Sequence, residues 1–408
     1  MASSHTPLNV GLVGVGGFGA AHLRSIEALE NEGKVRLRCV VSTSPAKHAE
    51  VKARLDPRGV RWYGSLEEML QGEADLECAV IPAPIHLHNR MTVAALARGR
   101  MVYLEKPPVP LIQQLNDLVT LDARRKVAVA FQQISSPLIR QLKKWKVEGA
   151  LGRIQALRVR ACWPRLTKYY RRSSWAAKLL LGKEPVFDGP ATNALAHQIH
   201  NLMFLGGEGM DAFGTPVEVE AELYRARPIE SYDAACLRGR FESGVEFSAA
   251  LAHCCETSLG VRLEIFGSKG NAWVADDGKS IGNSLGLPLP SLPQEDPILA
   301  AWRDYLEFAQ GRRARPPSFL ADTRPYVLAT NGMLIASEGI HAIPEAYVRA
   351  FGEGDDAGYE AAGLHALVEE CGRSGRLFSE QGAPWALKGR SVSLESLETL
   401  NLRDYRSR

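Results

Sequence analysis

Residues 10–29 read VGLVGVGGFGAAHLRSIEAL, an apolar run that passes through spaced glycines into an amphipathic pattern. Glycine allows a sharp turn and lets a ligand approach the backbone. The N-terminus of the helix that follows offers free N–H groups and the positive end of a dipole. The stretch therefore predicts a strand, a turn and a helix that hold a dinucleotide pyrophosphate, although a purely structural turn has the same pattern. The expected contacts are Gly14, Gly16, Gly17, Phe18 and Gly19.

The composition of the 408 residues is that of an ordinary globular protein, with 45% hydrophobic residues, 23% charged residues and a net charge of +3. This charge is too small to predict a nucleic-acid partner. The seven cysteines have no metal or disulfide spacing, and no signal peptide or membrane-length apolar run is present, so we expect a cytoplasmic protein without a membrane partner. The basic runs 143–146 and 312–315 predict solvent-exposed faces or loops.

The first part of the chain alternates apolar strands with amphipathic helices. Strands are predicted at 8–15, 35–41, 78–82, 101–104 and 127–131, and helices at 65–70, 87–98 and 111–125. Strands that are apolar throughout are typical of a parallel sheet with helices on both faces. We therefore predict an α/β fold that begins with a doubly wound Rossmann domain at residues 1–133.

The second part, residues 134–408, has a different texture. Apolar and polar residues alternate at 154–163, 218–224, 234–241, 245–253 and 261–266, with a hairpin turn at 241–245 and a loop at 281–293. This pattern predicts an α+β domain with a large, open, mostly antiparallel sheet, covered on one face by helices near 192–205 and 320–340. A C-terminal extension begins near residue 341, and its helical pattern places Tyr359, Leu364, Leu367, Val368 and Cys371 on one face for packing against this domain.

The residue that reads the adenosine ribose is expected after the second strand. NAD sites usually have an acid there, about twenty residues past the glycines. This chain instead has Ser42, Thr43, Ser44 and Lys47, which can bind a 2′-phosphate. The sequence therefore favours NADP over NAD, while an ordinary helix cap is the alternative interpretation.

Two segments of the first domain carry polar groups at strand ends. Pro84 to His88 is expected to turn past the nicotinamide, and Glu105-Lys106-Pro107 forms a charged corner. In a doubly wound sheet the carboxyl ends of the strands face the ligand, which places Pro84, His88, Glu105 and Lys106 among the cofactor contacts. A metal at His86 and His88 is conceivable, but no acid or cysteine accompanies them, and no metal is expected.

In the second domain Asn193 and His197 lie four residues apart and are expected on one face of a helix. His200 gives a His-x-x-His pair that could bind zinc, but no third ligand is evident. A histidine that is simply buried in the core is the other interpretation.

Together these segments resemble the family named for glucose–fructose oxidoreductase, inositol dehydrogenase and rhizopine catabolism, written Gfo/Idh/MocA. The similarity covers the glycine turn, 84–88, 105–107, 169–175, the 193–197 segment and 263–270, over roughly residues 8–340. It implies an NAD(P)-dependent oxidoreductase acting on a sugar, a polyol or cyclitol, or a sugar-derived carbonyl, and a homodimer or homotetramer formed through the C-terminal sheet.

The resemblance also implies roles for individual residues. Lys106 would bind the reacting oxygen, His197 would act as the acid/base, and Asn193 would position the substrate. The family usually has Asp where this chain has Asn193. Two alternative functions therefore remain: a cofactor-retaining isomerase, lyase or glycosidase, and a non-catalytic binding or sensor homologue. The expected substrate contacts are Lys106, Asn193 and His197, together with three aromatic residues that can stack on a sugar ring, Trp163, Tyr170 and Trp175.

Overall fold

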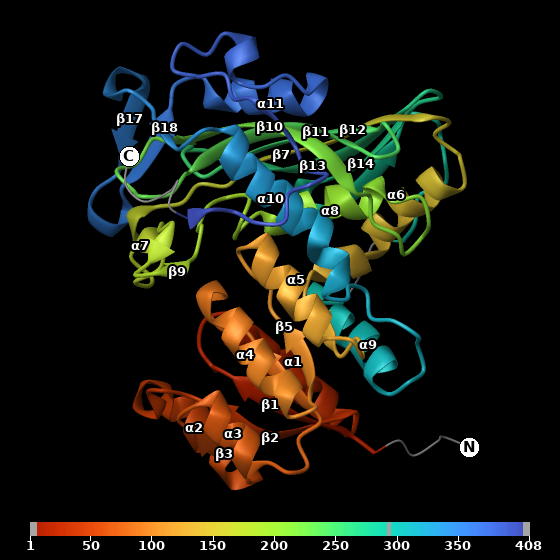
Figure 1. Cartoon of the computed structure of the whole chain (residues 1–408), viewed down its shortest axis with the longest axis vertical. Helices are drawn as coiled ribbons and strands as arrows, with labels where there is room; N and C mark the ends of the chain where they lie inside the picture. The colour runs from red at the N-terminus through yellow and green to blue at the C-terminus, as the bar shows by residue number, and fades with distance from the viewer. Residues whose placement is uncertain (1–5, 292–294, 403–408) are drawn as a thin grey trace. The chain divides into compact units, whose positions relative to one another are not determined.

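The computed structural model describes residues 6–291 and 295–402 (Figure 1). Its described residues form two compact units. The first contains 6–109, 114–135 and 295–323, and the second contains 110–113, 136–291 and 324–402. The first unit therefore includes a segment, 295–323, that the predicted boundary near residue 133 assigned to the second domain.

The first unit is built on a parallel sheet. Its strand order is β3-β2-β1-β4-β5-β6, and every neighbouring pair is parallel. The middle strands are buried on both faces, as Val10, Leu12 and Val80 show with 0% exposure. The predicted doubly wound sheet is confirmed. The strands are β1 (Leu8–Val13), β2 (Val35–Val41), β3 (Arg61–Tyr63), β4 (Cys78–Ile81), β5 (Met101–Leu104) and β6 (Val127–Val129).

The helices that accompany this sheet are α1 (Gly19–Asn31), α2 (Ala49–Leu55), α3 (Leu66–Gly72), α4 (Ile85–Ala97), α5 (Ile112–Leu121) and α9 (Pro297–Ala309). Helix α9 belongs to the first unit because its aromatic face is buried there. Trp302 and Tyr305 are 0% exposed, and Tyr305 stacks on Tyr103 of β5 with ring centroids 4.6 Å apart. This packing explains why segment 295–323 departs from the predicted boundary.

The second unit contains a nine-stranded sheet within the described residues, ordered β15-β14-β13-β7-β12-β11-β10-β16, with β19 also paired to β10. Within the described residues only the β7–β12 and β10–β16 pairs of this sheet are parallel, so the mostly antiparallel sheet is confirmed. The strands are β7 (Ile154–Cys162), β10 (Pro216–Arg225), β11 (Ala234–Phe241), β12 (Glu246–Ala252), β13 (Leu259–Gly267), β14 (Asn271–Ala275), β15 (Ser280–Asn283), β16 (His341–Ala342) and β19 (Ser391–Ser393).

The predicted hairpin joins β11 to β12. The Phe241 N–H donates to the Val245 carbonyl at 3.0 Å, and Gly244 has φ +82°, a conformation that suits glycine. The predicted loop 281–293 begins instead as strand, because β15 runs to Asn283. Residues 292–293 of that predicted loop lie outside the described residues.

Helices cover both faces of this sheet (Figure 1). The first face carries α8 (Ala196–Gly206) and α10 (Arg324–Ala336), as predicted, and α11 (Leu364–Ser374) lies on the opposite face. The remaining elements are α6 (Pro137–Val147), α7 (Thr167–Tyr170) and the short pairs β8 (Leu180–Leu181) with β9 (Glu184–Pro185) and β17 (Val348–Phe351) with β18 (Gly358–Ala361).

The C-terminal extension packs on the second unit through α11, as predicted. Leu364, Val368 and Cys371 are buried in one cluster with Cys162 and Cys236 of the sheet. Tyr359 does not share this helix, because it lies in β18. The extension therefore covers the apolar part of the sheet face opposite α8 and α10.

The basic run at 143–146 corrects one prediction. Lys143 is 0% exposed, and its Nζ donates to the carbonyls of Phe204 and Gly207 at 2.5 Å and of Ala212 at 3.0 Å. Lys146 also donates to Gly207. The last carbonyls of a helix lack partners within the helix, so cations are favourable there. Lys143 is thus a buried cap for the C-terminal end of α8 rather than a surface charge.

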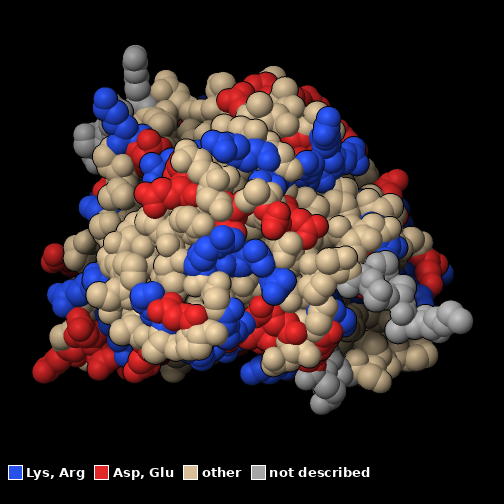
Figure 2. Space-filling model, turned by 90° about the horizontal axis from the view of Figure 1, so that it is seen from below, with Lys and Arg blue, Asp and Glu red and all other residues tan. Residues whose placement is uncertain are grey.

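Acidic and basic side chains are interspersed on the face shown in Figure 2, without a large area of one sign. This agrees with the small net charge of +3. Among the described residues, no helix has the length and apolar character needed to cross a bilayer.

Candidate coenzyme site and active-site residues

The glycine turn lies between β1 and α1 and has the geometry of a phosphate cradle. Gly14 has φ +94°, which residues with a side chain rarely adopt. A Cβ atom on Gly19 would lie 2.2 Å from the Gly14 carbonyl oxygen, so the turn can close only around glycine. The first turn of α1 contains no acidic residue, and the Phe18 ring beside it is 42% exposed. These features fit a dinucleotide pyrophosphate at the helix N-terminus.

The turn after β2 holds the residues expected at the ribose. The Oγ of buried Ser42 accepts from the Ser44 N–H at 3.3 Å, while Thr43 and Lys47 are exposed. His48 was not predicted, yet its ring fills the space beside Gly16, where an added Cβ would lie 2.8 Å from Cε1. The described turn therefore presents hydroxyl groups and a lysine, and no carboxylate follows β2 before Glu50.

His88 lies in the first turn of α4, as predicted, but its ring is 1% exposed. Nδ1 lies 2.8 Å from the Pro107 carbonyl oxygen, and Nε2 lies 2.7 Å from that of Ala83. Burial lowers the pKa of His88. The imidazole therefore ties the Ala83–Pro84 turn to the Glu105–Pro107 corner, and its contact with coenzyme stays a prediction.

The Glu105–Lys106 corner is held by a relay of buried side chains. Trp302 Nε1 donates to His22 Nδ1 at 3.0 Å, and His22 Nε2 lies 2.9 Å from Glu105 Oε1. Indole is only a donor, so the His22 proton resides on Nε2 and is donated to Glu105. The other carboxylate oxygen of Glu105 accepts from the Lys106 N–H at 3.0 Å. The backbone that carries Lys106 is therefore fixed from α1 and α9.

Of these four residues, Glu105 and Lys106 were predicted from the sequence, and His22 and Trp302 were not. His22 stands three residues past Gly19 on the face of α1 that faces the sheet, which is the one signal the sequence carried. Trp302 lies 280 residues away along the chain. No motif or spacing connects it to the corner.

In the second unit the structure corrects the local setting of Asn193. Helix α8 begins at Ala196, so Asn193 lies in the turn before it rather than on its face. The Asn193 N–H donates to the Gly189 carbonyl at 2.9 Å, and the Asn193 carbonyl accepts from the Ala196 N–H at 3.2 Å. His197 is in the first turn of α8 and is 7% exposed.

Asp188 lies directly beside Asn193. The Asn193 Nδ2 donates to Asp188 Oδ1 at 2.6 Å, although the residues are five positions apart. Asp188 is 5% exposed, and its Oδ2 accepts from the Ala177 N–H at 2.7 Å and from Arg172 at 3.4 Å. On a continuous helix Asp188 would lie off the face of Asn193, so it was not expected at the site; the structure corrects this, because α8 begins only at Ala196.

The aromatic residues expected at a sugar are each paired with an arginine. Arg165 lies 5.5 Å from the Trp163 ring centroid, Arg227 lies 4.7 Å from that of Tyr170, and Arg172 lies 4.8 Å from that of Trp175. Trp163 also donates its Nε1–H to Asp277 at 3.0 Å. These rings form cation–π contacts in the structure, and their contact with substrate stays a prediction.

Two further histidines are deeply buried. His200, the second member of the His-x-x-His pair, is 0% exposed, and burial lowers its pKa to about 3. Burial likewise lowers the pKa of His253 to about 3, and the Arg165 guanidinium adds to this effect. Both rings are therefore neutral at pH 7 and serve as core residues. Among the described residues, no group of His, Cys, Asp and Glu side chains is arranged to hold a metal ion.

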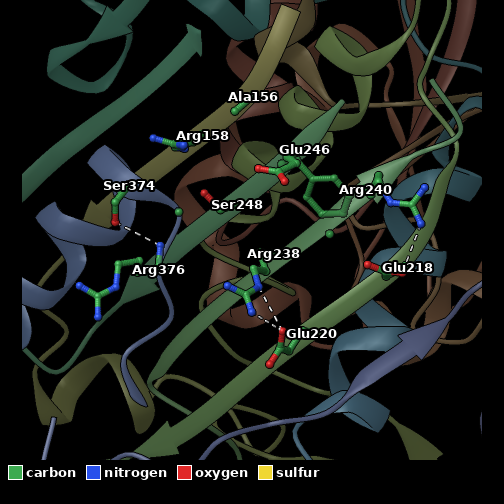
Figure 3. A pocket seen from close by; sticks show the side chains of 13 residues that line it. Ala156, Arg158, Glu218, Glu220, Arg238, Arg240, Glu246, Ser248, Ser374 and Arg376 are labelled. Atoms are coloured by element: carbon green, nitrogen blue, oxygen red, sulfur yellow. Dashed lines mark hydrogen bonds and ion pairs between the residues drawn. The ribbon is translucent and has the colours of Figure 1, made fainter. Parts of the chain in front are cut away.

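A charged cavity of about 240 Å³ lies on the α11 side of the large sheet (Figure 3). Arg238 pairs with Glu220 and Arg240 with Glu218 across β10 and β11, and Arg158, Glu246 and Arg376 also line the cavity. The cavity is therefore a distinct feature from the Asn193–His197 segment, whose helix lies on the opposite face of the sheet.

Comparison with known proteins agrees with the fold. A family model described as an oxidoreductase family with an NAD-binding Rossmann fold matches residues 8–133, and a model of the GFO/IDH/MocA C-terminal domain matches residues 139–273. Inositol 2-dehydrogenase from Burkholderia lata is 23% identical over 272 residues, which are 66% of this chain and 74% of that protein.

An uncharacterised oxidoreductase from Synechocystis sp. is 25% identical over 279 residues, covering 66% of this chain and 72% of its own. The crystal structure of the WlbA dehydrogenase from Bordetella pertussis, in complex with NADH and UDP-GlcNAcA, has a TM-score of 0.70. It is 21% identical and covers 81% of this chain and 95% of its own, which shows a shared fold. From the two matched models, this chain belongs to the GFO/IDH/MocA oxidoreductase family, and its first unit is an NAD-binding Rossmann domain.

Proposed function

We propose that this protein is an NAD(P)-dependent oxidoreductase that transfers a hydride between nicotinamide and a carbon of a sugar, polyol or cyclitol. The observation that carries the proposal is the Glu105–Lys106 corner, which follows β5 and is fixed by the relay from Trp302 through His22. Ligands of doubly wound sheets bind at the carboxyl ends of the strands, where this corner lies. Relatives named as inositol dehydrogenases support the substrate class.

The glycine turn would hold the pyrophosphate, and the bound coenzyme would supply the hydride acceptor or donor. Lys106 donates a hydrogen bond to the reacting oxygen and stabilises the negative charge that develops there. His197 takes the hydroxyl proton during oxidation and returns it during reduction. Asn193 positions the substrate. Trp163, Tyr170 and Trp175 provide apolar surface for the ring.

The preference for NADP is also part of the proposal. Ser42, Thr43 and Ser44 supply hydroxyl groups after β2, and Lys47 supplies a positive charge. A carboxylate, which would repel a 2′-phosphate, does not occur in residues 42–48. The WlbA crystal structure contains NADH, so the test must compare both coenzymes.

We further propose a homodimer or homotetramer formed through the second unit's sheet. The extension covers the apolar part of the α11 face. The interface would therefore use the charged part of this face, where Glu218 and Glu220 lie opposite Arg240 and Arg238 beside residues 374–376 of the extension. Light scattering should show that association depends on salt. The comparison is between low salt and 0.5 M salt, which is roughly five times the ionic strength at which the Debye length is about 10 Å. A monomer at all salt concentrations would contradict it.

The decisive experiment is titration of the purified protein with NADP and with NAD, followed by a screen of sugars and cyclitols at the nicotinamide absorbance band. Saturable coenzyme binding with substrate-dependent reduction is the expected result. Coenzyme that copurifies without net reduction would instead indicate an isomerase or lyase. Binding of neither coenzyme would refute the proposed function.

A further inference from the structure

The Asp188–Asn193 contact determines which way the Asn193 amide faces. The Asn193 amide and the Asp188 carboxylate are joined by a hydrogen bond of 2.6 Å, and a carboxylate can only accept. The branch of the amide that faces Asp188 must therefore be the NH2 group. The carbonyl oxygen Oδ1 then occupies the other branch of the amide carbon. The orientation follows from the chemistry of the partner, which settles the usual ambiguity between amide nitrogen and oxygen.

Asp188 is itself fixed from the other side. Its Oδ2 accepts from the Ala177 backbone N–H at 2.7 Å and from Arg172 at 3.4 Å. The Arg172 guanidinium carbon lies 3.7 Å from the Tyr169 ring centroid and 4.8 Å from the Trp175 ring centroid. The carboxylate therefore connects the aromatic segment 169–177 to the turn that leads into α8.

We propose that Asp188 is the positioning residue that locks Asn193 so that its Oδ1 acts as a hydrogen-bond acceptor toward a substrate hydroxyl or the His197 ring. This inference rests on the proposed function and deepens it. The locked amide offers the same acceptor as one oxygen of a carboxylate, and the negative charge resides one hydrogen bond away on Asp188. A single aspartate would supply both an acceptor and a negative charge. Here Asn193 supplies the acceptor and Asp188 supplies the charge.

The substitution Asp188→Asn should reverse the lock. The Ala177 N–H requires an oxygen opposite it, which directs the new amide NH2 toward Asn193. Asn193 must then turn its oxygen toward residue 188 and its NH2 toward the substrate. We expect kcat/KM to fall about 10- to 100-fold, since a charge-assisted hydrogen bond is lost and a donor replaces an acceptor. Coenzyme affinity should not change.

The exchange variant Asp188→Asn with Asn193→Asp is the matched rescue. The amide introduced at position 188 would donate its NH2 to the carboxylate introduced at position 193, whose second oxygen would again be an acceptor. The oxygen of the introduced amide would still face the Ala177 N–H. We expect this variant to recover most of the activity that Asp188→Asn loses. Glu230→Gln is the control, because Glu230 accepts from the Leu179 and Leu180 N–H groups nearby without contacting Asn193.

The single variant Asn193→Asp supplies a pH readout. Two carboxyl groups would then face each other across the present 2.6 Å contact and would have to share one proton. Its kcat/KM should decline as the pH rises and that proton is lost, and this decline should be absent in the exchange variant. A role limited to supporting the local fold would not produce this difference.

A readout without turnover separates this proposal from the proposed function. In protein labelled with 15N-asparagine, the Asn193 NH2 signal, assigned by its absence in Asn193→Asp, should be protected from solvent exchange and should lose that protection in Asp188→Asn. Unchanged protection in Asp188→Asn, or an exchange variant no more active than Asp188→Asn, would overturn the positioning role. Absence of coenzyme binding by the unmodified protein would refute the proposed function alone.

Discussion

Trp302 Nε1 donates a hydrogen bond to His22 Nδ1 at 3.0 Å across a separation of 280 residues in the chain. Both side chains are buried, and the bond begins the relay that ends at the backbone of Lys106. Helix α9, which comes late in the chain, thus fixes the Glu105–Lys106 corner, which comes early in it. The position of the Lys106 backbone therefore depends on α9.

Trp302→Phe should leave His22 Nδ1 buried without its donor. We expect the free energy of unfolding to fall by about 1–3 kcal/mol, the cost of an unsatisfied buried polar group. Urea denaturation measures this change. His22→Gln retains an acceptor and a donor and should cost less than His22→Leu; equal costs for the two would show that the relay contributes only packing.

Lys106→Met should abolish turnover while coenzyme affinity is retained, because the lost ammonium acts on the reacting oxygen rather than on the pyrophosphate. The expected loss of kcat is about 100- to 1000-fold, as for removal of one donor to a developing oxyanion. Lys126→Met is the control, since its Nζ donates to the Gly99 carbonyl at 2.5 Å and lies on the exposed surface. Full activity in Lys106→Met would eliminate the proposed mechanism.

Ser42→Asp should change the coenzyme preference. An aspartate there can still accept from the Ser44 N–H, which bonds Ser42 Oγ at 3.3 Å, so the turn is preserved. Its charge would repel a 2′-phosphate and accept from ribose hydroxyls, so NADP affinity should fall about tenfold or more while NAD affinity rises. Fluorescence titration with both coenzymes checks this. A parallel change in both affinities would argue against a ribose contact.

Lys143→Met should destabilise the second unit, because the carbonyls of Phe204, Gly207 and Ala212 each lose a buried donor, although Gly207 keeps the bond from Lys146. We expect the free energy of unfolding to fall by about 1–3 kcal/mol, the cost of leaving a buried carbonyl, here that of Ala212, without this donor. Lys144→Met, one residue away, is the matched control, since Lys144 is 55% exposed and its nearest carboxylate, Glu148, lies 3.8 Å away. Its effect should be under about 0.5 kcal/mol. Similar effects of both would contradict the cap.

Stability should decline in acid because of His200 and His253. Their pKa values are about 3 in the folded protein, against 6.5 ordinarily, so the unfolded chain binds more protons below pH 6.5. Their contribution is complete above pH 6.5 and is lost as the pH falls toward 3, by about 1.4 kcal/mol per pH unit for each ring. Urea denaturation from pH 7 to pH 4.5, at about half-unit steps, measures the slope. His200→Leu should reduce it by one ring's share, and an unchanged slope would contradict the assignment.

Local patterns in the sequence determined the two-part architecture. Apolar runs that continue unbroken require a sheet covered on both faces, and alternating runs require a sheet with unlike faces, so β1, β2 and β5 and later β7 and β11 could be located from residue type alone. Strand β3 was not predicted, since Arg61, Trp62 and Tyr63 are too few to show a period. The glycine turn was equally readable, because the conformation of Gly14 and the closeness of Gly19 to its carbonyl exclude other residues.

Only the tertiary structure decided what holds the functional groups in place. His22 of α1, which bonds Glu105, is itself held by Trp302 of α9, and Lys143 caps α8. The carboxylate beside Asn193 is Asp188, five residues earlier in the segment before α8. The physical reason is that periodicity reports which side of one element is buried, whereas a hydrogen bond between distant segments depends on where packing brings them together. The sequence of this protein therefore determines its elements and its phosphate turn, and the packing of those elements determines how its reactive side chains are oriented.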